Sequence, residues 1–207
     1  MTSFVDLYWL PLGADGNRLV AFSGRVYKAF AARFQHRVAC GLYHSALIAG
    51  DGSDSYVIEM GPAWGRHEPD RGVVATGPVG LAVLGRSRLF RYEVRCWKNG
   101  ILPDIAKAVS SPQRLSTSPI LARRVMHLTA RVPELTWGRD QLHAGDQWNS
   151  NSLVSWLLAA SGHNLSRAVI PEHGRAPGWA AGLALASSQH PSGHDIGVRA
   201  AKQIAQS

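Results

Sequence analysis

The sequence predicts an α+β fold in which helices pack against an antiparallel sheet, and three observations support this prediction. Two apolar runs, 42–49 and 56–63, flank the turn residues GDGSDS, a pattern typical of a β-hairpin. Apolar and charged residues alternate across 88–97, as they do in a strand with two different faces. Apolar residues recur at helical spacing within 150–161, and Gly162 follows where a left-handed cap usually falls. We therefore expect a hairpin, a further strand and a buried helix.

The remaining elements follow from periodicity and from turn residues. A chain of 207 residues can bury one sizeable core, so we expect one domain over 1–207, with a loop-rich segment at 165–207. The sheet should contain about five or six strands, which is a common sheet size. The other expected strands are 4–12, 72–80 and 181–187, and the other expected helices are 24–37, 104–109, 118–130 and 195–206.

Composition favours a folded protein of a reducing compartment. Hydrophobic residues make up 45% of the chain and charged residues 17%, which is a globular composition. The two cysteines, Cys40 and Cys96, are too few for a disulfide framework. The first residues lack the basic segment of a signal peptide, and no apolar run approaches the roughly 18 residues of a membrane helix. These observations predict a cytoplasmic protein without a transmembrane segment.

The net charge of +8 does not by itself predict nucleic-acid binding. Arginines are scattered singly or in pairs, without a basic block or interleaved aromatic motif. In the strand around 88–97, Arg91, Glu93 and Arg95 share one face, which we expect to be mostly solvated. A specific nucleic-acid partner is therefore not expected.

In the segment 145–162, four small polar residues in a row, Asn149, Ser150, Asn151 and Ser152, precede the apolar residues of the predicted helix. One such residue is enough to cap a helix by accepting a free backbone N–H. The others would then lie at the positive end of the helix dipole, where a nucleophile and its oxyanion are stabilised. The alternative is that one residue caps the helix and the rest occupy a solvated turn.

A histidine and an acid lie on neighbouring strands of the predicted hairpin. If the turn centres near 52–53, Glu59 falls opposite Ala46 and diagonal to His44 on the same face. A carboxylate there could hold the tautomer of the imidazole. The alternatives are a structural histidine among small and apolar neighbours, and a strand carboxylate that pairs with an arginine.

The order of these features, a histidine strand, a polar partner on the next strand and a later polar helix start, resembles the circularly permuted papain-like superfamily. This is the NlpC/P60-type group that includes lecithin-retinol acyltransferase-like and PPPDE-like proteins, and the match covers roughly 42–64 and 145–162. The helix there typically starts with Asn-Cys, and Asn149-Ser150 occupies that place here. The resemblance implies an antiparallel sheet with packed helices in the permuted papain-like architecture.

The resemblance further implies a hydrolase or acyltransferase that acts on an amide or ester bond through a Ser-His-Glu triad. In it Ser150 would be the nucleophile, His44 the general base and Glu59 the residue that orients the histidine. The expected partners are a small-molecule, lipid or peptide acyl substrate, and the residues expected at the substrate or oxyanion are Asn149, Trp148, Asn151 and Tyr43. Ser152 is a rival nucleophile, although its side chain should point roughly 200° away from that of Ser150.

The chain departs from the superfamily at the nucleophile, because neither cysteine is in position. Three alternatives follow: a working serine enzyme, a catalytically inactive member that serves as a ligand-binding module, or an engineered Cys→Ser change at Ser150. Several tryptophans, Trp64, Trp137 and Trp179 among them, suggest an aromatic-walled site, with core packing as the alternative. We expect no cofactor and no metal, since the nine histidines show no ligand spacing.

Overall fold

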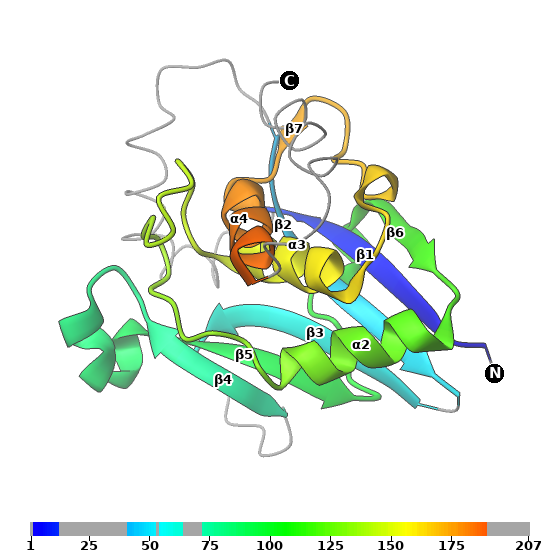
Figure 1. The fold of residues 1–207 in the computed structure, drawn as a ribbon, viewed down its shortest axis with the longest axis horizontal. Coiled ribbons are helices and arrows are strands. Elements are labelled where there is room, and N and C mark those ends of the chain that lie inside the picture. The colour runs from blue at the N-terminus through cyan, green and yellow to red at the C-terminus, as the bar shows by residue number, and fades with distance from the viewer. Residues whose placement is uncertain (1, 13–40, 53, 64–71, 190–207) are drawn as a thin grey trace.

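In the described part of the chain, six antiparallel strands form a sheet, and the helices α2, α3 and α4 lie in front of it (Figure 1). The computed structural model describes residues 2–12, 41–52, 54–63 and 72–189. The strand order is β4-β5-β3-β2-β1-β6, and a seventh short strand, β7, pairs in parallel with the start of β2. The strands are β1 (Phe4–Pro11), β2 (Gly41–Asp51), β3 (Asp54–Pro62), β4 (Val73–Pro78), β5 (Arg91–Lys98), β6 (Val109–Ser116) and β7 (Gly174–Arg175), and the helices are α2 (Pro119–Thr129), α3 (Ser150–Ser161) and α4 (Trp179–Gln189).

The predicted hairpin is confirmed, with the predicted register. Strands β2 and β3 pair so that Leu47 lies opposite Ile58 and Gly50 opposite Ser55. Gly52, in the turn, has a φ of +73°, a conformation that glycine adopts without steric cost. The first strand, the strand at 73–78, and the helices α2 and α3 also form where they were expected. The coarse fold class, α+β with an antiparallel sheet, is therefore correct.

Three expected elements differ in the structure. Residues 181–187 belong to helix α4 and not to a strand, because alanine and leucine there favour a helix over a strand. The strand expected from residue 88 begins at Arg91, after a short 3-10 turn. The helix expected at 104–109 is only the 3-10 turn Ile105–Lys107. The helices expected at 24–37 and 195–206 lie outside the described residues.

Strand β6 was not predicted at all. Its sequence, VSSPQRLS, is polar and contains a proline, a composition that argues against a central strand. It lies at one end of the strand order, next to β1, where a proline is tolerated because only one side needs ladder hydrogen bonds. Where the β1–β6 register shifts, Ser111 Oγ accepts a hydrogen bond from Trp9 N at 2.8 Å, which replaces a ladder bond. The Ser111 side chain thus satisfies a backbone N–H that the irregular β1–β6 pairing leaves without a backbone acceptor.

The main core lies between the sheet and the helices. Leu7, Leu47 and Ile58 from the strands pack in one cluster with Leu153 and Leu157 from α3. Helix α3 is buried along nearly its whole length, because β2, α2 and α4 surround it. This explains why its apolar residues are not confined to one side. Within the described ranges, no helix is both long and apolar enough to span a membrane.

Helices α3 and α4 cross in very close contact. At Gly182 in α4, an added Cβ would lie 2.0 Å from Ser152 O and 2.1 Å from Ser155 Oγ. No other residue type fits that position without a shift of one helix. Glycine normally weakens a helix by about 1 kcal/mol relative to alanine, so close packing must offset this cost.

A second, smaller apolar cluster lies on the opposite face of the sheet. It contains Leu10, Ala46, Val57 and Leu102, all almost completely buried. Successive strand residues point to opposite faces, so the even-numbered residues of β2 near Ala46 face this cluster, and the odd-numbered ones face the helices. This parity determines which of the predicted site residues can meet.

Candidate functional site

The polar residues at the start of α3 are bonded within the protein and are not in a solvated turn. Asn149 is the N-cap: its Oδ1 accepts hydrogen bonds from Asn151 N at 2.8 Å and Ser152 N at 3.3 Å. Ser152 Oγ in turn accepts from Asn149 N at 3.0 Å, which completes a capping box. The predicted cap is therefore Asn149, with Ser152 as its reciprocal partner.

Asn151 connects the first turn of α3 to two other parts of the chain. Its Nδ2 donates to Tyr43 O at 2.9 Å and to Pro177 O at 2.8 Å. Its Oδ1 accepts from Ser45 Oγ at 2.8 Å, on the strand β2. Both side chains of this last bond are almost fully buried. Asn151 thus fixes the position of α3 on β2 and on the loop before α4.

Hydrogen bonds from side chains to backbone groups also join the start of α3 to the start of α4. The Asp146 carboxylate accepts from Gly178 N at 2.8 Å and from Ala180 N at 3.2 Å, and burial raises the pKa of this carboxyl. Ser152 Oγ lies 2.7 Å from Gly178 O, and Ser155 Oγ donates to Trp179 O at 2.8 Å. A carboxylate at a helix N-terminus also interacts favourably with the helix dipole. Two helix starts therefore share one set of buried polar groups.

Ser150, the predicted nucleophile, differs from its neighbours. It is buried, with 5% of its surface exposed, and its hydroxyl makes no hydrogen bond to any described residue. It lies at the first helical position, where the dipole favours negative charge. Ser150 thus has the position at the helix N-terminus that is expected for a nucleophile. To act as one, its hydroxyl also needs a general base within hydrogen-bond reach.

His44, the predicted base, points to the other face of the sheet. In the β1–β2 ladder it lies opposite Leu10, a member of the small cluster away from the helices. The neighbouring residue, Ser45, faces the helices and bonds to Asn151. Burial lowers the pKa of His44 to about 4, so its ring is neutral at pH 7. The described structure does not bring His44 and Ser150 together, and it supports the alternative of a structural histidine.

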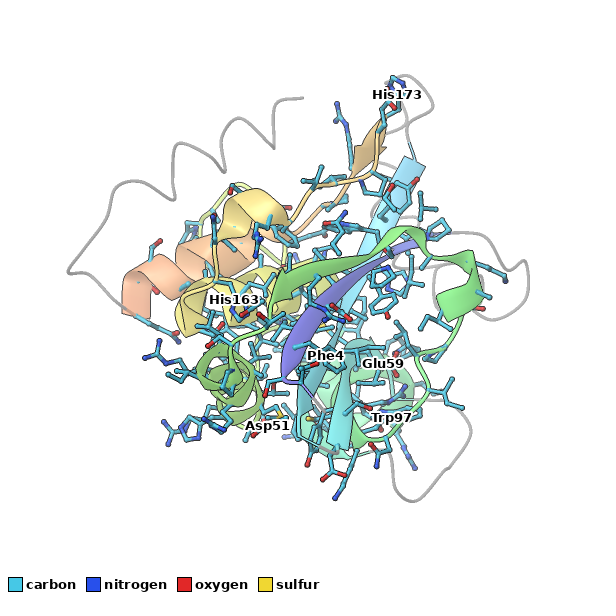
Figure 2. All side chains as sticks on the ribbon, turned by 90° about the vertical axis from the view of Figure 1, so that its right-hand side faces the viewer. Phe4, Asp51, Glu59, Trp97, His163 and His173 are labelled. Carbon is cyan, nitrogen blue, oxygen red and sulfur yellow. The ribbon has the colours of Figure 1, made fainter. Side chains whose placement is uncertain are left out.

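Glu59, the predicted orienting acid, is bonded to an arginine. Its Oε1 lies 3.1 Å from Arg95 Nη1, and the second acid Glu93 lies 3.1 Å from Arg95 Nη2. These side chains are only 8–13% exposed, so the face expected to be mostly solvated carries a largely buried ion cluster. Arg95 Nη2 also donates to Pro62 O at 2.9 Å. Glu59 therefore matches the alternative of a carboxylate paired with an arginine, and it lies across the strands from the helices (Figure 2).

The aromatic residues expected at the site serve mainly in the core. Trp148 is 1% exposed and packs in the main cluster, as do Trp137 and Trp179. The ring of Trp179 lies 5.3 Å from that of Trp9, in a tilted arrangement. Tyr43 is half-buried, and its backbone oxygen is the atom that Asn151 binds. Trp64 lies outside the described residues, as does Cys40.

Sequence reasoning missed two parts of this arrangement. Ser45 was not predicted as a site residue, because the prediction relied on the neighbouring His44. The alternation of the strand nevertheless places Ser45 and His44 on opposite faces of the sheet. The loop 174–178 was assigned to a loose tail, yet it supplies Pro177 O and Gly178 to the starts of both helices. Gly178 has a φ of +96°, and an added Cβ would lie 2.2 Å from Asn149 Oδ1. The consecutive residues Pro177 and Gly178, which precede an alanine-rich run, are the sequence feature that indicates a turn before a helix here.

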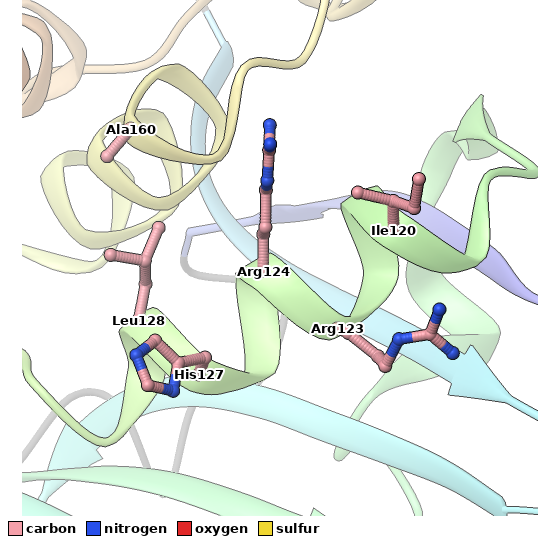
Figure 3. A pocket seen from close by; sticks show the side chains of 6 residues that line it. All are labelled: Ile120, Arg123, Arg124, His127, Leu128 and Ala160. Atoms are coloured by element: carbon pink, nitrogen blue, oxygen red, sulfur yellow. The ribbon is translucent and has the colours of Figure 1, made fainter.

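A pocket of about 390 Å³ lies between α2 and α3 (Figure 3). Its apolar lining is Ile120, Leu128 and Ala160, and its polar lining is Arg123, Arg124 and His127. Arg123 pairs with Asp51 at 3.4 Å, whereas Arg124 has no acidic partner among the described residues and rises toward α3 in Figure 3. The pocket therefore combines an apolar floor with an available guanidinium.

Metal-binding groups are not assembled in the described part of the chain: no three His, Cys, Asp or Glu side chains lie close enough to hold an ion. Cys96 is half-buried on β5, and burial raises the pKa of its thiol. A thiol with a raised pKa is a poor nucleophile at neutral pH. Comparison of the chain with family models, with curated proteins and with solved structures gives no match.

We predict that the four polar residues differ sharply in their contribution to stability. Asn149→Ala should lower the free energy of unfolding by about 0.5–2 kcal/mol through loss of the cap. Asn151→Ala should cost about 1–3 kcal/mol or more, because Ser45 Oγ and two backbone oxygens lose their partner. Ser150→Ala should change stability by less than about 0.5 kcal/mol. Urea unfolding of the three variants measures this order, and a cost for Ser150→Ala equal to that of Asn149→Ala would contradict it.

Another histidine whose pKa is lowered by burial follows α3. His163 is 7% exposed and lies beside the helices (Figure 2), and its Nδ1 is 2.7 Å from Ser161 Oγ. The Ser161 hydroxyl lies 2.6 Å from Leu157 O, so it donates there and His163 Nδ1–H donates to Ser161 Oγ. The buried Nε2 has no hydrogen-bond partner among the described residues. Protonation would place a charged N–H there, and burial lowers the pKa of His163 to about 4.

This shift predicts a loss of stability in mild acid. Below its usual pKa of 6.5 the unfolded chain binds a proton at residue 163, whereas the folded chain does not until about pH 4. Stability therefore falls as the pH decreases from 6.5 to 4, by about 1–2 kcal/mol at pH 5 for this residue. His163→Gln should reduce the slope of this part of the pH profile in urea unfolding by about half, because the pKa of His44 is also lowered to about 4 and that residue still contributes. An unchanged slope would show that His163 is not responsible.

Proposed function

We propose that this chain is a non-catalytic ligand-binding module, with an architecture of the permuted papain-like, NlpC/P60-type kind. The observation that carries the proposal is the 2.8 Å hydrogen bond from Ser45 Oγ to Asn151 Oδ1. It joins the β2 residue that faces α3 to the first turn of that helix, and these two residues are the direct neighbours of His44 and Ser150, to which the resemblance assigns the base and the nucleophile. The contact between β2 and the start of α3 is therefore made by Ser45 and Asn151, which bond to each other, and not by His44 and Ser150.

A serine hydrolase or acyltransferase would need a base within hydrogen-bond reach of its nucleophile. His44 lies on the other face of the sheet, opposite Leu10 of the small apolar cluster, and the carboxylate of Glu59 is paired with Arg95. Movement of a side chain alone cannot carry His44 across a paired strand, since the β1–β2 ladder is continuous from Phe4 to Pro11. The described geometry therefore favours binding over catalysis.

The pocket between α2 and α3 indicates the class of ligand. Three apolar residues line it beside two arginines, and the Arg124 guanidinium is not neutralised by a described acid. An arginine is well suited to bind a carboxylate, phosphate or sulfonate group. We therefore assign this pocket to a small anionic ligand that also has an apolar part.

The absence of catalysis can be tested with a fluorophosphonate probe that labels activated serines. We expect neither the protein nor its Ser150→Ala variant to be labelled, because Ser150 lacks a base. An active serine hydrolase in the same reaction serves as the positive control. Labelling of the unmodified protein that disappears in Ser150→Ala would overturn the proposal in favour of the enzyme.

Ligand binding can be tested with anilinonaphthalene sulfonate, which carries an anionic group on an apolar ring system. We expect saturable binding that Arg124→Gln weakens about tenfold, since a charge-assisted hydrogen bond is lost. Arg131→Gln, an exposed arginine just beyond α2 and outside the pocket lining, is the matched control and should bind as the unmodified protein does. Equal affinities for all three proteins would refute the assignment.

A further inference from the structure

The two arginines of the pocket between α2 and α3 differ in their partners. Arg123 Nη1 lies 3.4 Å from both carboxylate oxygens of Asp51, the last residue of β2. Arg124 has no acidic partner among the described residues, and its side chain points in a different direction from that of Arg123 in Figure 3. The residues that line the pocket include no acid. Asp51 is therefore an acid that acts on the pocket from outside, through Arg123.

Asp51 is held in place at the end of the β2–β3 hairpin. Ser3 Oγ donates a hydrogen bond to Asp51 Oδ1 at 3.2 Å. Asp54 lies opposite Asp51 in the ladder, and its carboxylate is 2.9 Å from Nζ of Lys98 on β5. The two acids of this turn thus have separate partners: Asp51 neutralises an arginine of the pocket, and Asp54 neutralises a lysine of the sheet.

The C-terminal end of α3 further limits the positive charge of the pocket. A Cβ added at Gly162, the C-cap of α3, would lie 3.7 Å from Arg124 Nη1. The end of a helix carries a partial negative charge, equivalent to roughly half an elementary charge. Two guanidinium charges less the Asp51 carboxylate leave one positive charge, and the helix end offsets part of it. The pocket can therefore neutralise a ligand with one negative charge but not a ligand with two.

We propose that Asp51 sets the charge of the ligand, so that the pocket selects amphiphiles with one negative charge, such as an alkyl sulfate or carboxylate, over phosphate monoesters. This inference rests on the proposed ligand-binding function and narrows its ligand class. A phosphate monoester carries about two negative charges near neutral pH. Its second charge would lose water beside the Asp51 carboxylate without an unpaired guanidinium to bind it, which is unfavourable. Asp51 is a positioning residue, because it acts on the ligand through Arg123.

Isothermal titration calorimetry with octyl sulfate and octyl phosphate tests the inference. The two ligands share an alkyl chain and a tetrahedral head group and differ in charge. At pH 8 free imidazole is uncharged and a phosphate monoester is doubly charged. We expect the unmodified protein to bind octyl sulfate about fivefold more tightly than octyl phosphate. Asp51→Asn should raise the affinity for octyl phosphate about tenfold and that for octyl sulfate less than about twofold, because it releases Arg123.

The hairpin turn supplies a matched control. Asp54→Asn removes the same charge from the same turn but releases Lys98, so the ratio of the two affinities should not change. Asp51→Glu keeps a carboxylate and should keep the ratio of the unmodified protein. Asp51→Asn combined with Arg123→Gln should return the affinity for octyl phosphate to its original level. Asparagine is also favoured in turns, and thermal unfolding confirms that each variant is folded.

The outcomes separate this inference from the function on which it rests. Equal or tighter binding of octyl phosphate by the unmodified protein, or an unchanged ratio in Asp51→Asn, would overturn the inference alone, provided that Arg124→Gln still weakens the binding of octyl sulfate. Absence of binding of both ligands, or binding of octyl sulfate that Arg124→Gln does not weaken, would overturn the inference together with the assignment of the pocket.

Discussion

The hydrogen bonds of Asn151 fix the relative positions of the sheet, α3 and the loop before α4. A buried amide must have its donors and acceptor satisfied, since each unpaired group costs free energy. Asn151 reaches this state only when Tyr43 O, Ser45 Oγ and Pro177 O are all in place. Three segments distant in sequence must therefore meet at one side chain. Gly182 of α4 lies against the next residues of α3, where an added Cβ would be 2.0 Å from Ser152 O.

This constraint also explains why a site rich in polar residues does not form a catalytic centre. Hydroxyl and amide groups that are fully occupied by structural hydrogen bonds are not free to take part in a reaction. The Ser150 hydroxyl makes no such hydrogen bond to a described residue. However, successive residues of β2 point to opposite faces of the sheet, so Ser45 faces the helices and His44 faces away from them. A catalytic group at this point of β2 would have to occupy an odd-numbered position. A shift of one residue along β2 thus decides whether a histidine or a serine faces the start of α3.

Most of the coarse fold could be predicted from the sequence, because its signals are local. The turn GDGSDS fixes the hairpin register, and Asn149 and Gly162 bound α3. The site could be predicted only in part. The same alternation that placed Glu59 and His44 on one face said nothing about which face α3 would cover, since that depends on packing between distant segments. Strand β6 was missed because its polar, proline-containing sequence conflicts with the strand that tertiary contacts impose. Helix α4 was missed although its alanine and leucine content favours a helix, because its apolar run was interpreted as a strand.

The position of β1 in the sheet has a consequence for biosynthesis. This strand lies between β2 and β6, and the bond from Trp9 N to Ser111 Oγ spans 102 residues. A growing chain exposes the apolar residues of β1 long before β6 has left the ribosome. Contacts of such long sequence separation form slowly, and an unpaired apolar strand edge can associate with other chains in the meantime. The yield of folded protein in the cell should therefore depend on the time between the synthesis of β1 and its pairing with β6.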